Sequence, residues 1–452
     1  MTTVTLVYPY FRPSGDRSIF RFPPLGLGYI AAYLRDHDVA VNIVDCTFLS
    51  QDEAIERVRS SNPDIIGIQS MFSMRNKSIE LAKLLKKDCK LLVAGGPLPS
   101  VDPEGFLESF DVVVVGEGEQ TMLELVRQAD GDFDPARTRG LAYRENGVTK
   151  LTPRREFIDN LDAIPFPARE SFDNQSYKDY YSRNFGYTIT PVMTSRGCPF
   201  TCDFCSRPIF GNGIRFGSAT NVTDEMEAVR SLGYSRIWFA DDCFTLNHRR
   251  LIDLCDEIIQ RGVRMEWECL SRVDTVSGEV VRKMKQAGCV RIFFGLESGN
   301  DFVLSLMQKH ATTGQAMEAV QMTKSSGIQV GAFFIVGYPG ETNETVLDTL
   351  KFASSLPLDY LSFTFPYPIP GTPLYDRVKE EMTPQDWEEH ERSLLTEHKL
   401  LYRSFFSEGK LTFAMMKGML QFYLRKYLGP IGYMLIGIPF EFLTNFMFKL
   451  IH

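Results

Sequence analysis

Three cysteines in one short loop constrain this chain more than any other feature. Cys198, Cys202 and Cys205 follow one another with the spacing C-x3-C-x2-C in the stretch Arg196-Gly-Cys-Pro-Phe-Thr-Cys-Asp-Phe-Cys-Ser206. Thiolates are the usual protein ligands of iron–sulfur clusters. Three of them on one loop can bind three irons of a four-iron cluster, which leaves the fourth iron open to a substrate or cofactor.

Two other interpretations of the loop fit the sequence less well. A structural zinc site needs a fourth Cys or His at knuckle spacing, and no second Cys pair or Cys/His cluster lies nearby. A disulfide framework is a poor match to nine cysteines, an odd number, and to an N-terminus without the features of a secretory signal. The other six cysteines lie in apolar segments, where small core residues are expected: Cys46, Cys89, Cys243, Cys255, Cys269 and Cys289.

Length and charge narrow the possible classes of protein. A chain of 452 residues predicts two or three domains. The net charge of -8 does not give the basic footprint of a nucleic-acid-binding protein, so we expect no nucleic acid partner. If the cluster is present, the expected setting is cytoplasmic, reducing and poor in oxygen.

Short apolar runs alternate with helical stretches in the first third of the chain. The expected strands are 4–7, 39–44, 64–69, 91–94 and 112–115, and the expected helices between them are 24–35, 53–60 and 78–87. This alternation predicts a doubly wound parallel sheet, which binds ligands beyond the carboxyl ends of its strands. The loops at those ends are 8–16, 70–74, 95–97 and 116–119. None carries the dinucleotide motif G-x-G-x-x-G, so NAD binding is not indicated.

A second series of strands and helices begins after a connector. A small hairpin is expected at 141–152, because Asn146-Gly147 is a strong turn signal. Residues 159–167 read as a Pro-rich extended linker that several aromatic residues follow. The next strand-like runs are 190–194, 236–240, 266–271, 290–296, 329–336 and 360–366, with helical stretches between them. The three-cysteine loop follows the first of these six runs, at the end where barrel chemistry is found.

The cysteine spacing and the strand-end loops resemble the cobalamin-binding radical S-adenosylmethionine (SAM) family, the class B radical SAM methyltransferases, over about residues 1–375. The resemblance implies an α/β fold. A Rossmann-like cobalamin-binding domain is expected at 1–135 and a connector at 136–186. A partial (β/α)6 radical SAM core is expected at 187–380, and a helical, apolar C-terminal region at 381–452.

The same resemblance implies three cofactors: a [4Fe-4S] cluster on the three cysteines, SAM and cobalamin. In this family the nucleotide tail of cobalamin lies between the strands, and Ser70, Gly95 and Gly96 match the tail-binding motifs. Gly116 and Glu117 belong to the next strand-end loop and are expected to contact the same cofactor. The loop after the first strand has no His, so we expect cobalt to lack a protein imidazole ligand. The alternative is a domain that has lost its cofactor.

Polar residues at successive strand ends of the second series resemble the family's SAM-binding positions. Asp241 or Asp242 would accept from the SAM amino group, Arg272 would grip its carboxylate, and Glu297 would contact its ribose. Gly337 would offer its backbone to the adenine or the corrin edge, and Tyr367, the candidate catalytic residue, would face the reaction space. Simpler roles stay open: the Asp pair can cap a helix, Arg272 can pair with Asp274, and Glu341 can lie in a first helical turn.

The family's chemistry implies a methyltransferase acting on an unactivated carbon through methylcobalamin and a 5′-deoxyadenosyl radical. A protein side chain is the expected substrate, although a tetrapyrrole, a lipid or a natural-product intermediate would also fit. Ferredoxin or flavodoxin is the expected electron donor. Two alternatives stay open: a cyclase or rearrangement enzyme without net methylation, and a non-catalytic iron–sulfur protein.

The C-terminal tail allows two interpretations. Residues 384–401 read as an acidic helix and 412–425 as an amphipathic one, while 427–448 are strongly apolar but broken by glycines and prolines. A spanning helix needs about 20 apolar residues in a row, which this stretch does not supply. We expect the tail to pack over the barrel mouth. It would otherwise contact a membrane surface or an apolar partner through a basic fringe of Lys417, Arg425, Lys426 and Lys449.

Overall fold

The computed structural model describes residues 2–12, 16, 18–129, 131, 133–207, 209–382 and 400–451. These residues form two compact units. The first unit contains the described residues within 1–199 and 206–236, and the second contains those within 200–205, 237–387 and 397–452. The expected acidic helix at 384–401 lies almost wholly outside the described residues.

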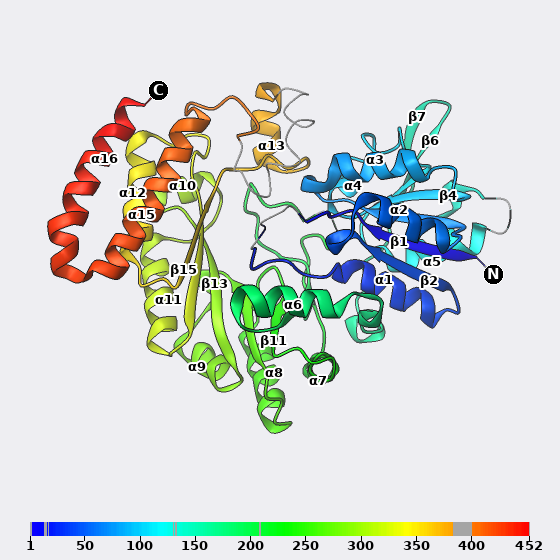
Figure 1. The fold of residues 1–452 in the computed structure, drawn as a ribbon, viewed down its shortest axis with the longest axis horizontal. Helices are drawn as coiled ribbons and strands as arrows, with labels where there is room; N and C mark the ends of the chain where they lie inside the picture. Colours follow the sequence, from blue (N-terminus) through cyan, green and yellow to red (C-terminus); the bar gives the residue numbers. More distant parts are fainter. Residues whose placement is uncertain are drawn as a thin grey trace. The chain divides into compact units, whose positions relative to one another are not determined.

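A seven-stranded sheet forms the centre of the first unit (Figure 1). Its strands are β1 (Thr3–Tyr8), β2 (Ala40–Asp45), β3 (Ile65–Gln69), β4 (Leu91–Gly95), β5 (Val112–Val114), β6 (Leu141–Glu145) and β7 (Val148–Leu151), in the order β2-β1-β3-β4-β5-β6-β7. The first five are parallel, as predicted. The hairpin that the sequence placed in the connector pairs antiparallel with β5 and extends this sheet.

Helices cover both faces of this sheet. They are α1 (Leu25–Asp36), α2 (Gln51–Ser60), α3 (Arg75–Leu85), α4 (Pro97–Val101) and α5 (Glu119–Ala129). One apolar cluster joins α1 and α5 to strand residues such as Leu6, and a second joins α2, α3 and α4 to strand residues such as Val7. Neighbouring side chains of a strand point to opposite faces, so this arrangement is the doubly wound fold that the alternation predicts.

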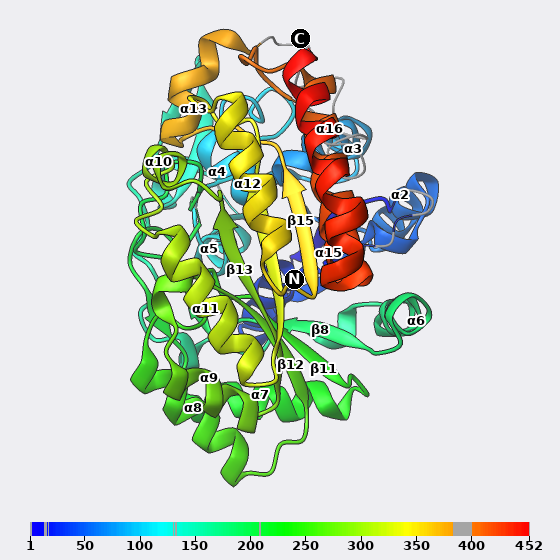
Figure 2. The same cartoon turned by 90° about the vertical axis from the view of Figure 1, so that its left-hand side faces the viewer.

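Six strands in sequential order make up the second sheet, β15-β14-β13-β12-β11-β8. They are β8 (Ile189–Val192), β11 (Arg236–Phe239), β12 (Glu266–Ser271), β13 (Cys289–Glu297), β14 (Gln329–Ile335) and β15 (Tyr360–Thr364). The helices between them are α7 (Ala219–Ser231), α8 (His248–Gln260), α9 (Gly278–Gln286), α10 (Asp301–Leu306), α11 (Thr313–Ser325) and α12 (Asn343–Ser355). Figure 2 shows α11 and α12 in front of the strands. This is the partial (β/α)6 barrel.

Two parts of the chain differ from the elements expected at the connector and the barrel start. The aromatic stretch that follows the linker forms α6 (Asn174–Phe185), in which Asp173 accepts a capping hydrogen bond from the backbone of Ser176. Its tyrosines are buried, so they pack as one face of a helix. A two-stranded ribbon of β9 (Ser195–Arg196) and β10 (Arg215–Phe216) adjoins the three-cysteine loop.

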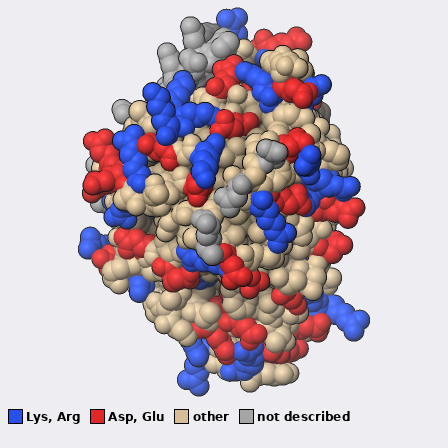
Figure 3. Space-filling view, turned by 90° about the vertical axis from the view of Figure 1, so that its right-hand side faces the viewer, with Lys and Arg blue, Asp and Glu red and all other residues tan. Residues whose placement is uncertain are grey.

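The C-terminal tail packs against α12 and β15 of the second unit. After α13 (Pro373–Val378), the tail forms α15 (Glu408–Gly432), a π-helical turn (Tyr433–Gly437) and α16 (Ile438–Leu450). Gly418 of α15 lies so close to Leu350 of α12 and Phe363 of β15 that an added Cβ would approach both within 2.9 Å. Among the described helices, none combines the length and apolar character needed to cross a bilayer. Figure 3 shows acidic and basic side chains interspersed on the face drawn.

Candidate active site

The three cysteines lie in a folded loop. Cys198 and Cys202 are buried and Cys205 is exposed. The Cys205 backbone donates a 3.2 Å hydrogen bond to the Cys202 carbonyl, which closes a tight turn. All nine cysteines belong to the described part of the chain and none forms a disulfide. Among the described residues, no three His, Cys, Asp or Glu side chains gather as ligands of a single metal ion. A four-iron cluster differs from such a site because each thiolate binds a separate iron.

Asp203 anchors the second half of this loop, a role that the sequence analysis missed. Its side chain is fully buried and accepts hydrogen bonds from the Tyr338 hydroxyl and, at 2.6 Å, from Arg377 of α13. Its backbone donates to the Met307 carbonyl at 3.1 Å and accepts from the Leu374 amide at 3.0 Å. An Asp beside a ligand Cys was the only signal, and its partners lie more than a hundred residues away in the chain.

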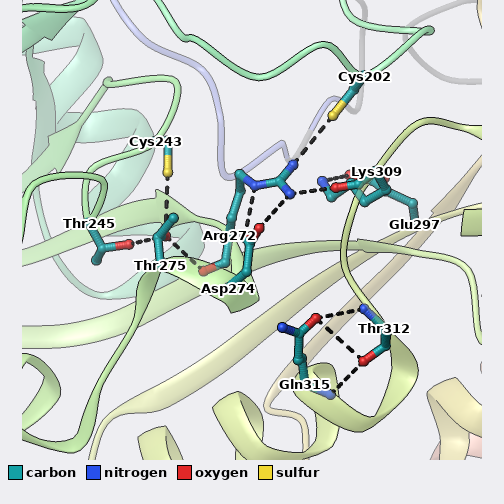
Figure 4. Close-up of polar contacts among 10 residues, drawn as sticks. All are labelled: Cys202, Cys243, Thr245, Arg272, Asp274, Thr275, Glu297, Lys309, Thr312 and Gln315. Carbon is teal, nitrogen blue, oxygen red and sulfur yellow. Dashed lines mark hydrogen bonds and ion pairs between the residues drawn. The ribbon is translucent and has the colours of Figure 1, made fainter. Parts of the chain in front are cut away.

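Arg272, at the end of β12, contacts the cysteine loop directly (Figure 4). Its Nη1 lies 3.4 Å from the Cys202 sulfur, and the Phe200 ring centroid is 3.8 Å from its guanidinium carbon. Its Nε and Nη2 donate to the two oxygens of Asp274 at 2.9 and 2.8 Å. The simpler pairing with Asp274 is therefore the one that forms. Arg272 therefore joins Asp274 to the cysteine loop, and its role toward the SAM carboxylate stays a prediction.

Glu297 is held by a lysine that the sequence analysis did not single out. It ends β13 at an irregularity in the strand pairing, with a positive φ of 62°, and its carboxylate lies 2.8 Å from the Lys309 ammonium. Both side chains are buried, so each charge is compensated by the other. Glu297 keeps its predicted position at the strand end, and its role toward the SAM ribose stays a prediction.

The other candidate SAM residues also follow their strands. Asp241 is buried and Asp242 exposed after β11. Tyr367 follows β15, and burial raises the pKa of its hydroxyl. Gly337 follows β14, and an added Cβ would meet the Leu411 side chain of the tail at 2.4 Å. Its predicted backbone contact to the adenine or the corrin edge stays a prediction.

A cavity of about 200 Å³ opens at the carboxyl ends of β3, β4 and β5 in the first unit. The predicted cofactor residues Gly95, Gly96, Gly116 and Glu117 line it, together with apolar side chains such as Val93 and Met122. Gln69 also lines it, and its buried Oε1 has no hydrogen-bond partner among the described residues. An unpaired buried acceptor at a cavity wall suits a ligand that donates a hydrogen bond.

Ser70 lies next to the cavity wall and holds one of its glycines. Its side chain is fully buried and its backbone amide donates to the Gly95 carbonyl at 2.8 Å, but it is not among the residues of the wall. Gly96 has a φ of 106°, and an added Cβ would lie 2.7 Å from the Ser70 carbonyl oxygen. The close turn therefore requires glycine at position 96. His37 ends α1 with Nδ1 2.8 Å from the Tyr33 carbonyl, and it does not line the cavity.

The Glu117 carboxylate is occupied by other groups of the protein. Its carboxylate lies 2.8 Å from Arg196 and 2.9 Å from Arg215, and it accepts from the Ile158 amide at 2.8 Å. Arg196 also bonds Glu119 at 2.6 Å. Burial lowers the pKa of Arg196, but Glu119 and Glu117 outweigh burial and raise it. The side chain predicted to contact cobalamin therefore joins the cavity loop to the residue two positions before Cys198.

Comparison with known proteins agrees with this arrangement. Residues 17–126 match the B12 binding domain and residues 192–353 match the radical SAM superfamily. An uncharacterized methyltransferase of Pyrococcus horikoshii is 34% identical over 413 residues, covering 89% of this chain and 88% of the relative. The chain belongs to the cobalamin-dependent radical SAM methyltransferase family. Its cofactors are a [4Fe-4S] cluster, SAM and cobalamin.

Two further proteins resemble this chain. The anaerobic magnesium-protoporphyrin IX monomethyl ester cyclase of Rubrivivax gelatinosus is 28% identical, covering 86% of this chain and 72% of the relative. The radical SAM methyltransferase TsrM of Kitasatospora setae, solved with cobalamin and a [4Fe-4S] cluster, superposes with a TM-score of 0.71 at 20% identity. That match covers 84% of this chain and 75% of TsrM. At this identity the likeness shows the fold alone.

Proposed function

We propose that the enzyme transfers a methyl group to an unactivated carbon. The observation that carries this proposal is the ion-pair network of Arg196, Glu117 and Glu119, which links the glycine-lined cavity to the start of the cysteine loop. A shared buried network supports joint use of the two cofactors in one reaction. When bound, they supply a hydrogen-abstracting radical and a methyl group.

The chemistry explains why two cofactors are needed. An unactivated C–H carbon has no lone pair with which to attack the methyl group of SAM. Removing a hydrogen atom first makes that carbon reactive. The chain's own residues then have defined tasks: the three cysteines bind the cluster, Arg272 and Asp203 position their loop, and Gln69 offers a hydrogen-bond acceptor at the cavity wall.

The product balance tests this proposal. The reconstituted enzyme, incubated without oxygen with SAM, a ferredoxin- or flavodoxin-type donor and substrate, should release one S-adenosylhomocysteine and one 5′-deoxyadenosine per methyl group transferred. The triple variant Cys198→Ala, Cys202→Ala, Cys205→Ala should release no 5′-deoxyadenosine. Methylation by that variant would contradict the proposal.

The predicted substrate, a protein side chain, is tested with SAM carrying a deuterated methyl group. Cell extract incubated with the enzyme is separated into protein, lipid and small-molecule fractions, and each is analysed by mass spectrometry. Label in a peptide supports the prediction, whereas label confined to the lipid or small-molecule fraction overturns it. Heat-inactivated enzyme is the control.

A cyclase is the second candidate, because a curated relative is a magnesium-protoporphyrin ester cyclase. The two functions differ in one product. Ring formation without net methylation releases 5′-deoxyadenosine but no S-adenosylhomocysteine in step with it. Turnover of that kind would favour the cyclase and exclude the methyltransferase.

A further inference from the structure

The helical hairpin of α15 and α16 carries apolar side chains on its outside. Fourteen of the 23 exposed large hydrophobic side chains of the described residues lie between Met416 and Leu450. They are therefore concentrated on this hairpin. We call them the outer apolar face, and its most exposed members are Met416, Tyr427, Ile431, Leu435 and Phe442. Exposed apolar patches of this kind mark interaction sites.

The pattern along α16 shows that this exposure is ordered. Ile438, Phe442, Phe446 and Leu450 recur at every fourth residue and are 52%, 78%, 59% and 60% exposed. Residues at this spacing share one face of a helix. Thr444 and Phe448, on the other side, are buried. The outward stripe is thus a continuous apolar surface along the whole helix.

Polar groups occupy the inside of the hairpin. Lys417 donates to Gln421 at 2.9 Å, and Gln421 donates to Glu441 of α16 at 2.6 Å. Both Lys417 and Gln421 are buried. Burial lowers the pKa of Lys417 to about 8, against the effect of Glu441. A helix in water normally keeps its polar side outward. This hairpin instead buries Lys417 and Gln421 along with apolar residues such as Phe422, and leaves a stripe of apolar side chains exposed.

Cations border the turn between the two helices. Arg425 lies 4.6 Å from the ring centroid of Tyr433, and the exposed Lys426 donates to the Asp359 carbonyl at 3.2 Å. Both come within two residues of Tyr427, which is 73% exposed, at the end of α15 that leads into the turn. Gly429, with a φ of 65°, provides the bend that follows them. An apolar surface with aromatic residues and a basic border suits the headgroup region of a bilayer.

We propose that the outer apolar face binds the surface of an anionic lipid bilayer. The hairpin would lie in the headgroup region with Arg425 and Lys426 on lipid phosphates. A second copy of the chain is a poorer occupant, because a symmetric pair through the hairpin turn would bring these cations close to their own equivalents. The inference does not rest on the proposed function, since binding to lipid needs no turnover.

Vesicle flotation of the full reconstituted protein tests the proposal. Vesicles of phosphatidylcholine mixed with phosphatidylglycerol should carry the protein, and vesicles of phosphatidylcholine alone should carry much less. The variant Leu435→Glu with Phe442→Glu should weaken binding by about tenfold or more, because two exposed apolar anchors are lost. Arg425→Glu with Lys426→Glu should weaken binding to the anionic vesicles by on the order of tenfold.

Phe302→Glu is the matched control, since Phe302 is 59% exposed on α10 and lies outside the outer apolar face. It should bind like the unaltered protein. Three results would overturn the proposal: no flotation with either vesicle, flotation unchanged in the Leu435/Phe442 variant, or equal binding to both vesicles. Concentration-dependent dimers in sedimentation, abolished by Leu435→Glu with Phe442→Glu, would assign the face to a second copy instead.

Discussion

Arg272 shows how a side chain suited to a ligand's carboxylate is already held by a carboxylate of its own chain. Its planar fork suits a carboxylate, and the carboxylate that it finds is Asp274, two residues away. The remaining edge of the guanidinium then faces the Cys202 sulfur. Hydrogen bonds to the sulfurs help to set the reduction potential of iron–sulfur clusters. We therefore expect Arg272 to act as a positioning residue for the cluster.

Replacing this donor should change the cluster without removing it. We expect Arg272→Met to retain iron but to lower the reduction potential by on the order of tens of millivolts, because a positive donor near the thiolate is lost. A redox titration followed by electron paramagnetic resonance measures it. The exposed Arg264→Met is the control and should leave the potential unchanged. An equal potential in Arg272→Met would show that the contact has no electronic effect.

Glu341 predicts a pH dependence of stability. Burial raises its pKa to about 8, although the Tyr338 and Gly337 amides lower it. The folded state then holds a proton that the unfolded chain releases above its ordinary pKa near 4.5. The free energy of unfolding should therefore fall as pH rises from about 4.5 to 8, by up to about 1.4 kcal/mol per pH unit.

Thermal unfolding of Glu341→Gln across this range checks the prediction. The amide cannot ionise, so its unfolding temperature should vary less with pH than that of the unaltered protein. Glu318→Gln, at an exposed position of α11, should keep the original profile. Parallel profiles for Glu341→Gln and the unaltered protein would argue against the raised pKa.

Among the elements, the β4–α4 turn has the strictest sequence requirement. Gly96 combines a positive φ with a Cβ position 2.7 Å from the Ser70 carbonyl. We expect Gly96→Ala to destabilise the first unit by roughly 1–3 kcal/mol and to weaken cobalamin binding, because the cavity wall must move. Hydroxocobalamin titration by absorbance measures the binding. Gly26→Ala, on α1 with nothing within 4 Å of its added Cβ, should fold normally.

The sequence predicted the elements well where one pattern dominates. The apolar runs that became β1 to β5 and the six strands of the barrel lie within a few residues of their predicted bounds. The alternating pattern could not reveal α6, because its buried tyrosines read equally well as anchors of an extended linker. The pairing of β6 with β5 could not be predicted either. A hairpin motif defines its own turn, but not the strand against which the hairpin packs.

Site residues also fall into two groups, those that a local motif predicts and those that depend on a distant partner. The cysteines and the glycines of the cavity were found from motifs, whose spacing is local. Lys309, Asp203 and Arg196 were missed as positioning residues because each depends on a partner far along the chain. Glu117 was found at the cavity, but its use by Arg196 and Arg215 could not be foreseen from the sequence.

At the scale of the molecule, Glu117 joins the cavity loop to Arg196, two residues before Cys198. We expect Glu117→Gln to weaken cobalamin binding and iron retention together, because Arg215 and Arg196 lose a buried carboxylate. Breaking a buried pair of this kind costs about 3–5 kcal/mol. Iron analysis and corrin absorbance on the same sample measure both. Gly96→Ala should reduce only the corrin signal, and loss of the corrin signal alone in Glu117→Gln would contradict the connection.

The hydrogen bonds of Asp203 also bear on how the enzyme matures. Tyr338, Arg377, Met307 and Leu374 hold its side chain and backbone with protein atoms alone. Much of the chain entropy of ordering this part of the loop is therefore lost when the protein folds, before iron arrives. Oxygen that destroys the cluster should leave a folded apoprotein behind. Reloading iron and sulfide should then restore the cluster without unfolding the chain.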